Sequence, residues 1–108
     1  MNKFKVAFIG LINGIKHKSI CVQYIITLFV VLFSLYIKMN YIQLIIIIIC
    51  CFSVITFEYV NTTLEKVCDL ITEDYNDKVK NIKDLSAGYV LLQAIMSVIV
   101  FLIIIFNL

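Results

Sequence analysis

Three long runs of apolar residues constrain this chain more than any other feature of its sequence. They lie at about residues 20–37, 42–64 and 85–106. A helix that crosses a bilayer needs about 20 predominantly apolar residues, so each run is long enough to span one. A soluble domain of 108 residues could not bury a composition that is 63% hydrophobic. The sequence therefore predicts an all-α membrane protein with three transmembrane helices.

Residues 2–18 show a different pattern. Phe4, Phe8, Leu11 and Ile15 recur at helical spacing, and lysines lie around them. Such a basic amphipathic segment is typical of a helix that lies in the membrane interface. The segment also contains a G-x-x-x-G motif, which permits close helix packing, although a chance pair of glycines explains it equally well. We therefore expect an N-terminal surface helix before the three spans, within a single domain of residues 1–108.

The lysines predict the orientation of the chain in the membrane. Four precede the first span, one lies in the turn at Lys38, four lie between the second and third spans, and none follows the third. Since cytoplasmic loops carry an excess of basic residues, the N-terminus and the acidic segment at residues 65–84 are expected in the cytoplasm and the C-terminus outside. The chain has no arginine, so a nucleic-acid partner is not expected.

The acidic residues are confined to one part of the chain. All seven lie between Glu58 and Asp84. Within that part, four polar residues are spaced by three, four and four positions, which places them on one face of a helix. They are Glu58, Asn61, Glu65 and Asp69. Because the preceding apolar residues 42–57 supply only about 24 Å of helix, against a hydrocarbon core of about 30 Å, Glu58 lies close to the lipid boundary. An ionisable group at that depth is a functional candidate.

Each of these residues also has a simpler interpretation. A helix that leaves a membrane must become polar, so Glu65 and Asp69 are consistent with a solvated exit turn. Lys83 is consistent with a lysine that snorkels to the interface. Asp84 is consistent with an N-cap for a helix that begins at Leu85. The position of Glu58, which arrives before the span is complete, favours a functional site.

The chemistry that these residues can support is limited by what the chain lacks. There is no G-x-x-x-x-G-K-[ST] loop to bind phosphate. Phosphoryl transfer without such a loop requires a metal held by carboxylates, a cation at the phosphates, and a general base for the acceptor hydroxyl. Glu65, Lys83 and Glu58 can take these three roles.

Three motifs then follow one another at fixed spacing. They are Glu58-x-x-Asn61-Thr62-x-x-Glu65-Lys66-x-x-Asp69, Glu73-Asp74-Tyr75-Asn76, and Lys80-x-x-Lys83-Asp84-x-x-Ala87-Gly88-x-Val90-Leu91. Together with the three spans and the length of the chain, they resemble the prokaryotic diacylglycerol kinase and undecaprenol kinase family. The resemblance implies a homotrimeric kinase of the bacterial plasma membrane, with active sites shared between subunits. It also implies ATP as phosphoryl donor, Mg²⁺ as cofactor and a membrane lipid alcohol as acceptor.

The resemblance also implies roles for individual residues. Glu58 matches the general base and Glu65 the metal ligand, while Asn61 and Asp69 match the polar residues that support them. The residues that match ATP-binding positions are Lys83, Asp84, Asp74, Tyr75 and Asn76. Residue types and spacing alone indicate the same roles for Glu58, Glu65 and Lys83. They do not assign a role to the loop at residues 74–76.

The N-terminal part departs from the family pattern. The family has a second metal-binding glutamate near the position of Lys18 and an arginine near that of Val22, whereas this chain has no acidic residue before Glu58. Either Asp69 or Asp74 of a neighbouring subunit completes the metal site, or the chain is an impaired homologue with a structural or regulatory role. Heavy use of Ile, Lys and Asn resembles proteins of AT-rich genomes. Family members from Gram-positive bacteria of that sort tend to be undecaprenol kinases, so undecaprenol leads diacylglycerol as the expected acceptor.

Overall fold

The computed structural model describes residues 2–108, which contain four α-helices and no strand. The helices are α1 (Lys3–Ile15), α2 (Lys18–Tyr36), α3 (Tyr41–Ile71) and α4 (Asp77–Phe106). The last three are long and apolar enough to cross a membrane. The predicted fold class, an N-terminal helix followed by three membrane-length helices, is confirmed.

Local sequence signals set the ends of the helices. The Asn40 side chain accepts a hydrogen bond from the backbone N–H of Gln43, and the Gln43 side chain accepts one from the backbone N–H of Asn40. This capping box starts α3 by satisfying backbone donors that a helix leaves free. Just before it, Lys38 adopts a left-handed conformation with φ of 61°, which ends α2 and reverses the chain. The result is a tight antiparallel pair of helices.

Helices α3 and α4 extend beyond the predicted spans. α3 continues through residues 65–71, and α4 begins at Asp77, so most of the acidic segment at residues 65–84 is helical. No proline or glycine occurs in that segment to break either helix. Only residues 72–76 form a connection. The carboxylates and lysines of the segment therefore lie on regular helices, where their spacing along the sequence determines which of them share a helix face.

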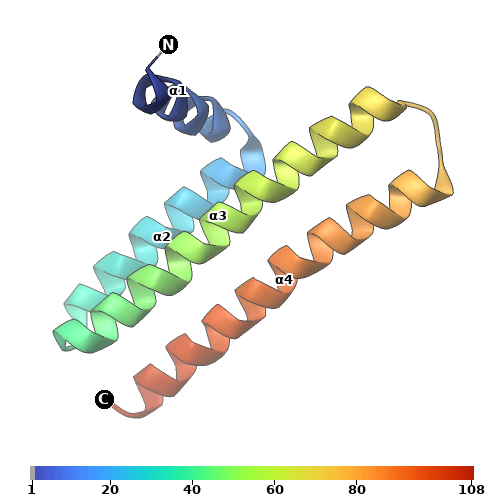
Figure 1. Ribbon diagram of the computed structural model, residues 1–108. Coiled ribbons are helices and arrows are strands. Elements are labelled where there is room, and N and C mark those ends of the chain that lie inside the picture. The colour runs from blue at the N-terminus through green and yellow to red at the C-terminus, as the bar shows by residue number, and fades with distance from the viewer. Residues whose placement is uncertain (1) are drawn as a thin grey trace.

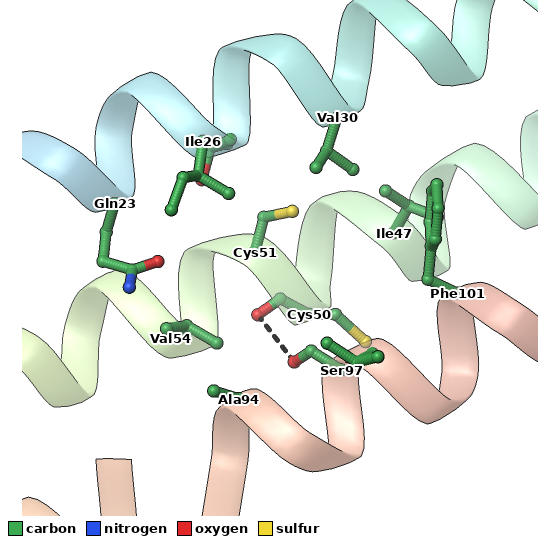
Figure 2. A pocket seen from close by; sticks show the side chains of 12 residues that line it. Gln23, Ile26, Val30, Ile47, Cys50, Cys51, Val54, Ala94, Ser97 and Phe101 are labelled. Carbon is green, nitrogen blue, oxygen red and sulfur yellow. Dashed lines mark hydrogen bonds between the residues drawn. The ribbon is translucent and has the colours of Figure 1, made fainter. Parts of the chain in front are cut away.

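α3 is the central helix of the bundle. It packs against α2 on one side and α4 on the other, and α4 runs antiparallel to it (Figure 1). A groove of about 250 Å³ remains over α3, between α2 and α4. Its apolar wall includes Ile26 of α2, Cys51 and Val54 of α3, and Ala94 and Phe101 of α4 (Figure 2).

Tyr59 of α3 contacts α1 through a hydrogen bond and through the packing of its ring. Its hydroxyl donates a hydrogen bond of 2.7 Å to the backbone carbonyl of Leu11, and it lies 3.0 Å from the Tyr24 hydroxyl. The Tyr59 ring packs directly on buried Gly14. From that contact α1 turns away from α2 (Figure 1). Since α1 has the pattern of a surface helix, Tyr59 marks the level of the membrane interface on α3.

Candidate active site

Glu58 lies one helical turn beyond Val54, the last residue of α3 that lines the apolar groove. It is next to Tyr59, and so it stands at the level of the surface helix. Cys51 and Val54, which line the groove, precede Glu58 on the same face of α3. Glu58 is only 9% exposed. The structure therefore places one buried carboxylate beside the end of the apolar groove, at the level of the surface helix α1.

The Glu58 carboxylate is available to a ligand. Within residues 2–108, no hydrogen bond from another side chain or from the backbone reaches its oxygens. Over the same residues, no fully buried side-chain oxygen or nitrogen lacks a partner. The two unpartnered oxygens of Glu58 must therefore touch open space. A carboxylate that is largely shielded from bulk water and has unpartnered oxygens is suited to take a proton from a bound hydroxyl.

Glu65 is held by a hydrogen-bond chain that crosses from α3 to α4. The Asn61 side chain donates a hydrogen bond of 2.8 Å to Glu65 Oε1. The Asn61 carbonyl oxygen accepts one of 2.6 Å from the hydroxyl of Ser86. The spacing of Asn61 and Glu65 by one helical turn makes the first contact local, whereas the second depends on how α4 packs on α3.

Lys83 reaches across from α4 to α3. Its ammonium nitrogen lies 2.8 Å from Asp69 Oδ1, and the two side chains are 39% and 57% exposed. An exposed pair of this kind contributes about 0–1 kcal/mol. Lys83 can therefore leave Asp69 for a phosphate group at little cost in free energy.

Asp84, which follows Lys83 in the chain, has a different ion-pair partner. It pairs instead with Lys80, one turn earlier on the same helix, at 2.6 Å. The prediction that Asp84 caps a helix beginning at Leu85 is wrong, because α4 already begins at Asp77. The residue that caps α4 is Asn76.

The predicted nucleotide loop lies in the connection between α3 and α4, at the end of the bundle away from the α2–α3 turn (Figure 1). Asp74, Tyr75 and Asn76 are all exposed. The Asn76 side chain accepts hydrogen bonds from the backbone N–H groups of Lys78 and Val79, so it is engaged in capping α4. No hydrogen bond or ion pair within residues 2–108 joins the loop to Glu58 or Glu65.

Tyr75 is an exposed loop residue whose hydroxyl group interacts with a neighbouring carboxylate. The carboxylate of Asp77 beside it raises the pKa of the Tyr75 phenol above its usual range. The phenol therefore keeps its proton at neutral pH. Its side chain is 78% exposed, so a nucleotide can reach it from solvent.

A magnesium ion would find an incomplete set of ligands in one chain. Among residues 2–108 no three side chains of His, Cys, Asp or Glu converge. Glu65 offers one oxygen besides the one bonded to Asn61, and Asp69 is paired with Lys83. Mg²⁺ is commonly held by one or two carboxylates together with water and substrate phosphates. Glu65 therefore fits this ion as one ligand beside the phosphates of ATP.

The N-terminal positions that depart from the family pattern lie at the start of α2. Lys18 is the first residue of that helix and is exposed, and Val22 follows about one turn later. A lysine at this point adds positive charge and no oxygen ligand. The structure thus supplies no substitute within α2 for the missing glutamate.

Two residues that contact the site were missed by the sequence analysis. Ser86 and Tyr89 lie one turn apart on α4, 3.1 Å from each other through their hydroxyl groups. The only sequence signal for Ser86 is its position one turn after Lys83, inside the third motif. Its contact with Asn61 depends on the register of two helices, which no local pattern reveals.

Comparison with known families is consistent with this geometry. The chain matches the family model for prokaryotic diacylglycerol kinase over residues 5–105. The match covers α2, α3 and most of α1 and α4, so it extends the resemblance beyond the motifs around Glu58. No curated protein shows a significant match to the chain.

Proposed function

Because this chain belongs to the prokaryotic diacylglycerol kinase family, we propose that it transfers the γ-phosphoryl group of ATP to the hydroxyl group of a membrane lipid alcohol. The reaction takes place at the cytoplasmic face of a bacterial plasma membrane. Undecaprenol is the first acceptor to test and diacylglycerol the second. The family and the three apolar helices support a multi-pass membrane lipid kinase, and the choice of acceptor is the finer part of the proposal.

The observation that carries the proposal is the position of Glu58. Its unpartnered carboxylate lies one helical turn beyond Val54, at the end of a groove that runs along α3 past Val54 and Cys51. A lipid alcohol whose chain lies in this groove brings its hydroxyl group to Glu58. A soluble acceptor would gain nothing from an apolar groove at this depth. Glu58 therefore acts as the general base that accepts the proton of the lipid hydroxyl.

The other site residues serve the nucleotide. Glu65 lies two turns, or about 10 Å, beyond Glu58 along α3, which leaves room for the transferred phosphoryl group between them. Lys83 exchanges its contact with Asp69 for the phosphate groups of ATP. Magnesium bound at Glu65 would neutralise the charge that develops on those groups. Asp84 and the loop at residues 74–76 contribute to binding the nucleotide.

The active protein is proposed to be a homotrimer. One chain leaves Glu65 with an incomplete set of metal ligands, and three helices in a row cannot enclose a site. A neighbouring subunit would cover the open side of the groove. It would also supply the acidic residue that α2 lacks, from Asp69 or Asp74.

The experiment is a direct assay of phosphoryl transfer. Purified protein in lipid nanodiscs is given γ-labelled ATP and magnesium, with undecaprenol in one arm and diacylglycerol in the other. We expect labelled lipid in at least one arm. Glu58→Gln should lower kcat by about 10²–10⁴-fold, the usual contribution of a general base. Glu65→Gln should raise the magnesium concentration required for activity.

Glu73→Gln is the matched control for both variants. It makes the same chemical change at an exposed carboxylate of the α3–α4 connection, and it should leave the rates within about twofold. Wild-type protein that phosphorylates neither lipid would contradict the proposal. So would a Glu58→Gln variant that is as active as Glu73→Gln.

A second candidate function is favoured by one observation. The absence of any acidic residue before Glu58, with Lys18 near the position of a family glutamate, is expected of an impaired homologue with a structural or regulatory role. This candidate predicts wild-type protein that is folded in the membrane and inactive toward both lipids. It also predicts that Glu58→Gln changes no phenotype of cells that carry it.

A further inference from the structure

Ser86 is the most deeply buried polar side chain near the candidate site. It is 2% exposed and lies on the face of α4 that packs against α3. Its hydroxyl donates a hydrogen bond of 2.6 Å to the carbonyl oxygen of the Asn61 side chain. At this burial no water molecule can take the place of Ser86 as hydrogen-bond donor to Asn61. The Ser86 hydroxyl group therefore links α4 to the side chain of Asn61.

The contact determines which way the Asn61 amide points. An amide has an oxygen that accepts and a nitrogen that donates, and a flip about the side chain exchanges the two. With its oxygen held by Ser86, Asn61 turns its NH₂ group to Glu65, at 2.8 Å. In the flipped amide the oxygen would face the Glu65 carboxylate, and the two would repel each other.

The Ser86 hydroxyl group has a second polar neighbour, the hydroxyl group of Tyr89. The hydroxyl groups of Ser86 and Tyr89 lie 3.1 Å apart. A serine hydroxyl has a single proton, and the shorter bond to Asn61 takes it, so the phenol of Tyr89 supplies the proton of the longer bond. Its ring is fixed against Phe57 of α3, with ring centroids 5.5 Å apart. The proton donors therefore run in one direction, from Tyr89 through Ser86 and Asn61 to Glu65.

We propose that Ser86 is a positioning residue that fixes the side-chain amide of Asn61 and, through it, the orientation of the Glu65 carboxylate. One oxygen of Glu65 is bonded to Asn61, and the other is left for a cation. The contribution of Ser86 to catalysis rests on the proposed kinase function, whereas its effect on Asn61 does not. In this proposal Ser86 acts through Asn61 and not by direct contact with substrate or metal.

The direct test observes the Asn61 amide by NMR in protein with ¹⁵N-labelled asparagine side chains. The Asn61→Asp variant identifies the signal, and Glu65→Gln shows how far it moves when the acceptor loses its charge. We expect Ser86→Ala to shift the signal toward the position of a free amide. Tyr89→Phe, which keeps the ring, should shift it less and in the same direction. This second variant keeps the test decisive if Ser86→Ala does not fold.

Ser97→Ala is the matched control. Ser97 also lies on α4 and faces α3, but its hydroxyl donates to the backbone carbonyl of Gln93 at 2.9 Å and does not reach Asn61. A general loosening of the α3–α4 contact would affect both serine variants alike. An Asn61 signal that moves equally in Ser97→Ala and Ser86→Ala, or in neither, would overturn the proposal.

Metal binding gives a second measurement that does not need turnover. Mn²⁺ affinity, measured by electron paramagnetic resonance without ATP, should fall by about threefold to tenfold in Ser86→Ala and stay constant in Ser97→Ala. If the protein is active, KM for MgATP should rise by a similar factor with a smaller change in kcat. Inactive wild-type protein in which the Asn61 signal still moves selectively would refute the kinase function and leave the role of Ser86 standing.

Discussion

Replacement of Gly14 by alanine tests how the surface helix is attached to the bundle. A Cβ atom at Gly14 would overlap Cε1 of Tyr59 and lie 2.8 Å from the Tyr59 hydroxyl oxygen. The ring would have to move away from α1. That movement breaks its hydrogen bond of 2.7 Å to the carbonyl of Leu11 and disturbs its contact with Tyr24. We therefore expect Gly14→Ala to weaken the attachment of α1.

The size of the effect follows from three contributions. Overpacking of a close contact costs about 1–3 kcal/mol. The lost hydrogen bond contributes about 0.5–1.5 kcal/mol. Alanine in place of glycine inside a helix returns about 1 kcal/mol. The net destabilisation is expected to be about 0.5–3.5 kcal/mol.

Gly10→Ala is a control within the same helix. Apart from Gly10 itself, its two chain neighbours and the adjacent backbone of α1, no heavy atom of the described residues lies within 4 Å of a Cβ atom built at Gly10. This variant gains the helical preference of alanine without a clash, so it should stabilise the protein by up to about 1 kcal/mol. The two glycine variants should thus differ by about 1.5–4.5 kcal/mol in the free energy of unfolding, although the chemical change is the same.

The assay is reversible unfolding in mixed micelles, combined with hydrogen exchange of the α1 amides. Exchange in α1 should accelerate in Gly14→Ala and not in Gly10→Ala. In a Tyr59→Ala background the obstacle is gone, so Gly14→Ala should then behave like Gly10→Ala. Equal stability of the two glycine variants in the wild-type background would refute this account of the packing.

Three further predictions concern the candidate site. Lys83→Gln should raise KM for ATP by about tenfold or more, whereas Asp69→Asn, which breaks an exposed ion pair, should leave the free energy of unfolding nearly unchanged. Lys18→Glu should lower the magnesium concentration at half-maximal activity, because it adds a carboxylate near the position where the family has one. Cys51→Phe should raise KM for the lipid acceptor in a dilution series by narrowing the groove, and Cys21→Phe, outside the groove, should not.

Much of the fold could be predicted from the sequence because it depends on local properties. Apolar runs long enough for a bilayer predict the three long helices, and the basic amphipathic start predicts α1. The spacing of Glu58, Asn61, Glu65 and Asp69 predicts that they share one helix face, because the periodicity of a helix is the same in every context. The contact between Asn61 and Glu65 at 2.8 Å follows from that spacing.

Contacts between helices were decided by the tertiary structure. Lys80 and Lys83 lie three residues apart on α4. Lys83 nevertheless pairs with Asp69 of α3, whereas Lys80 pairs with Asp84 of α4. The two glycines of the G-x-x-x-G motif are equivalent in sequence, yet only Gly14 lies under a tyrosine ring. The register that brings Ser86 to Asn61 also depends on how α4 packs against α3.

The physical reason is the range of the interactions. Periodicity and hydropathy act over a few residues, so they are encoded wherever those residues stand together. The register between two helices results from packing along their whole lengths and from the five-residue connection at residues 72–76 that joins them. The amino-acid sequence by itself therefore determined that Glu58 and Glu65 lie in one row at the edge of the membrane. The packing of α4 and α1 on α3 decided which side chains hold that row in place and where the groove beneath it runs.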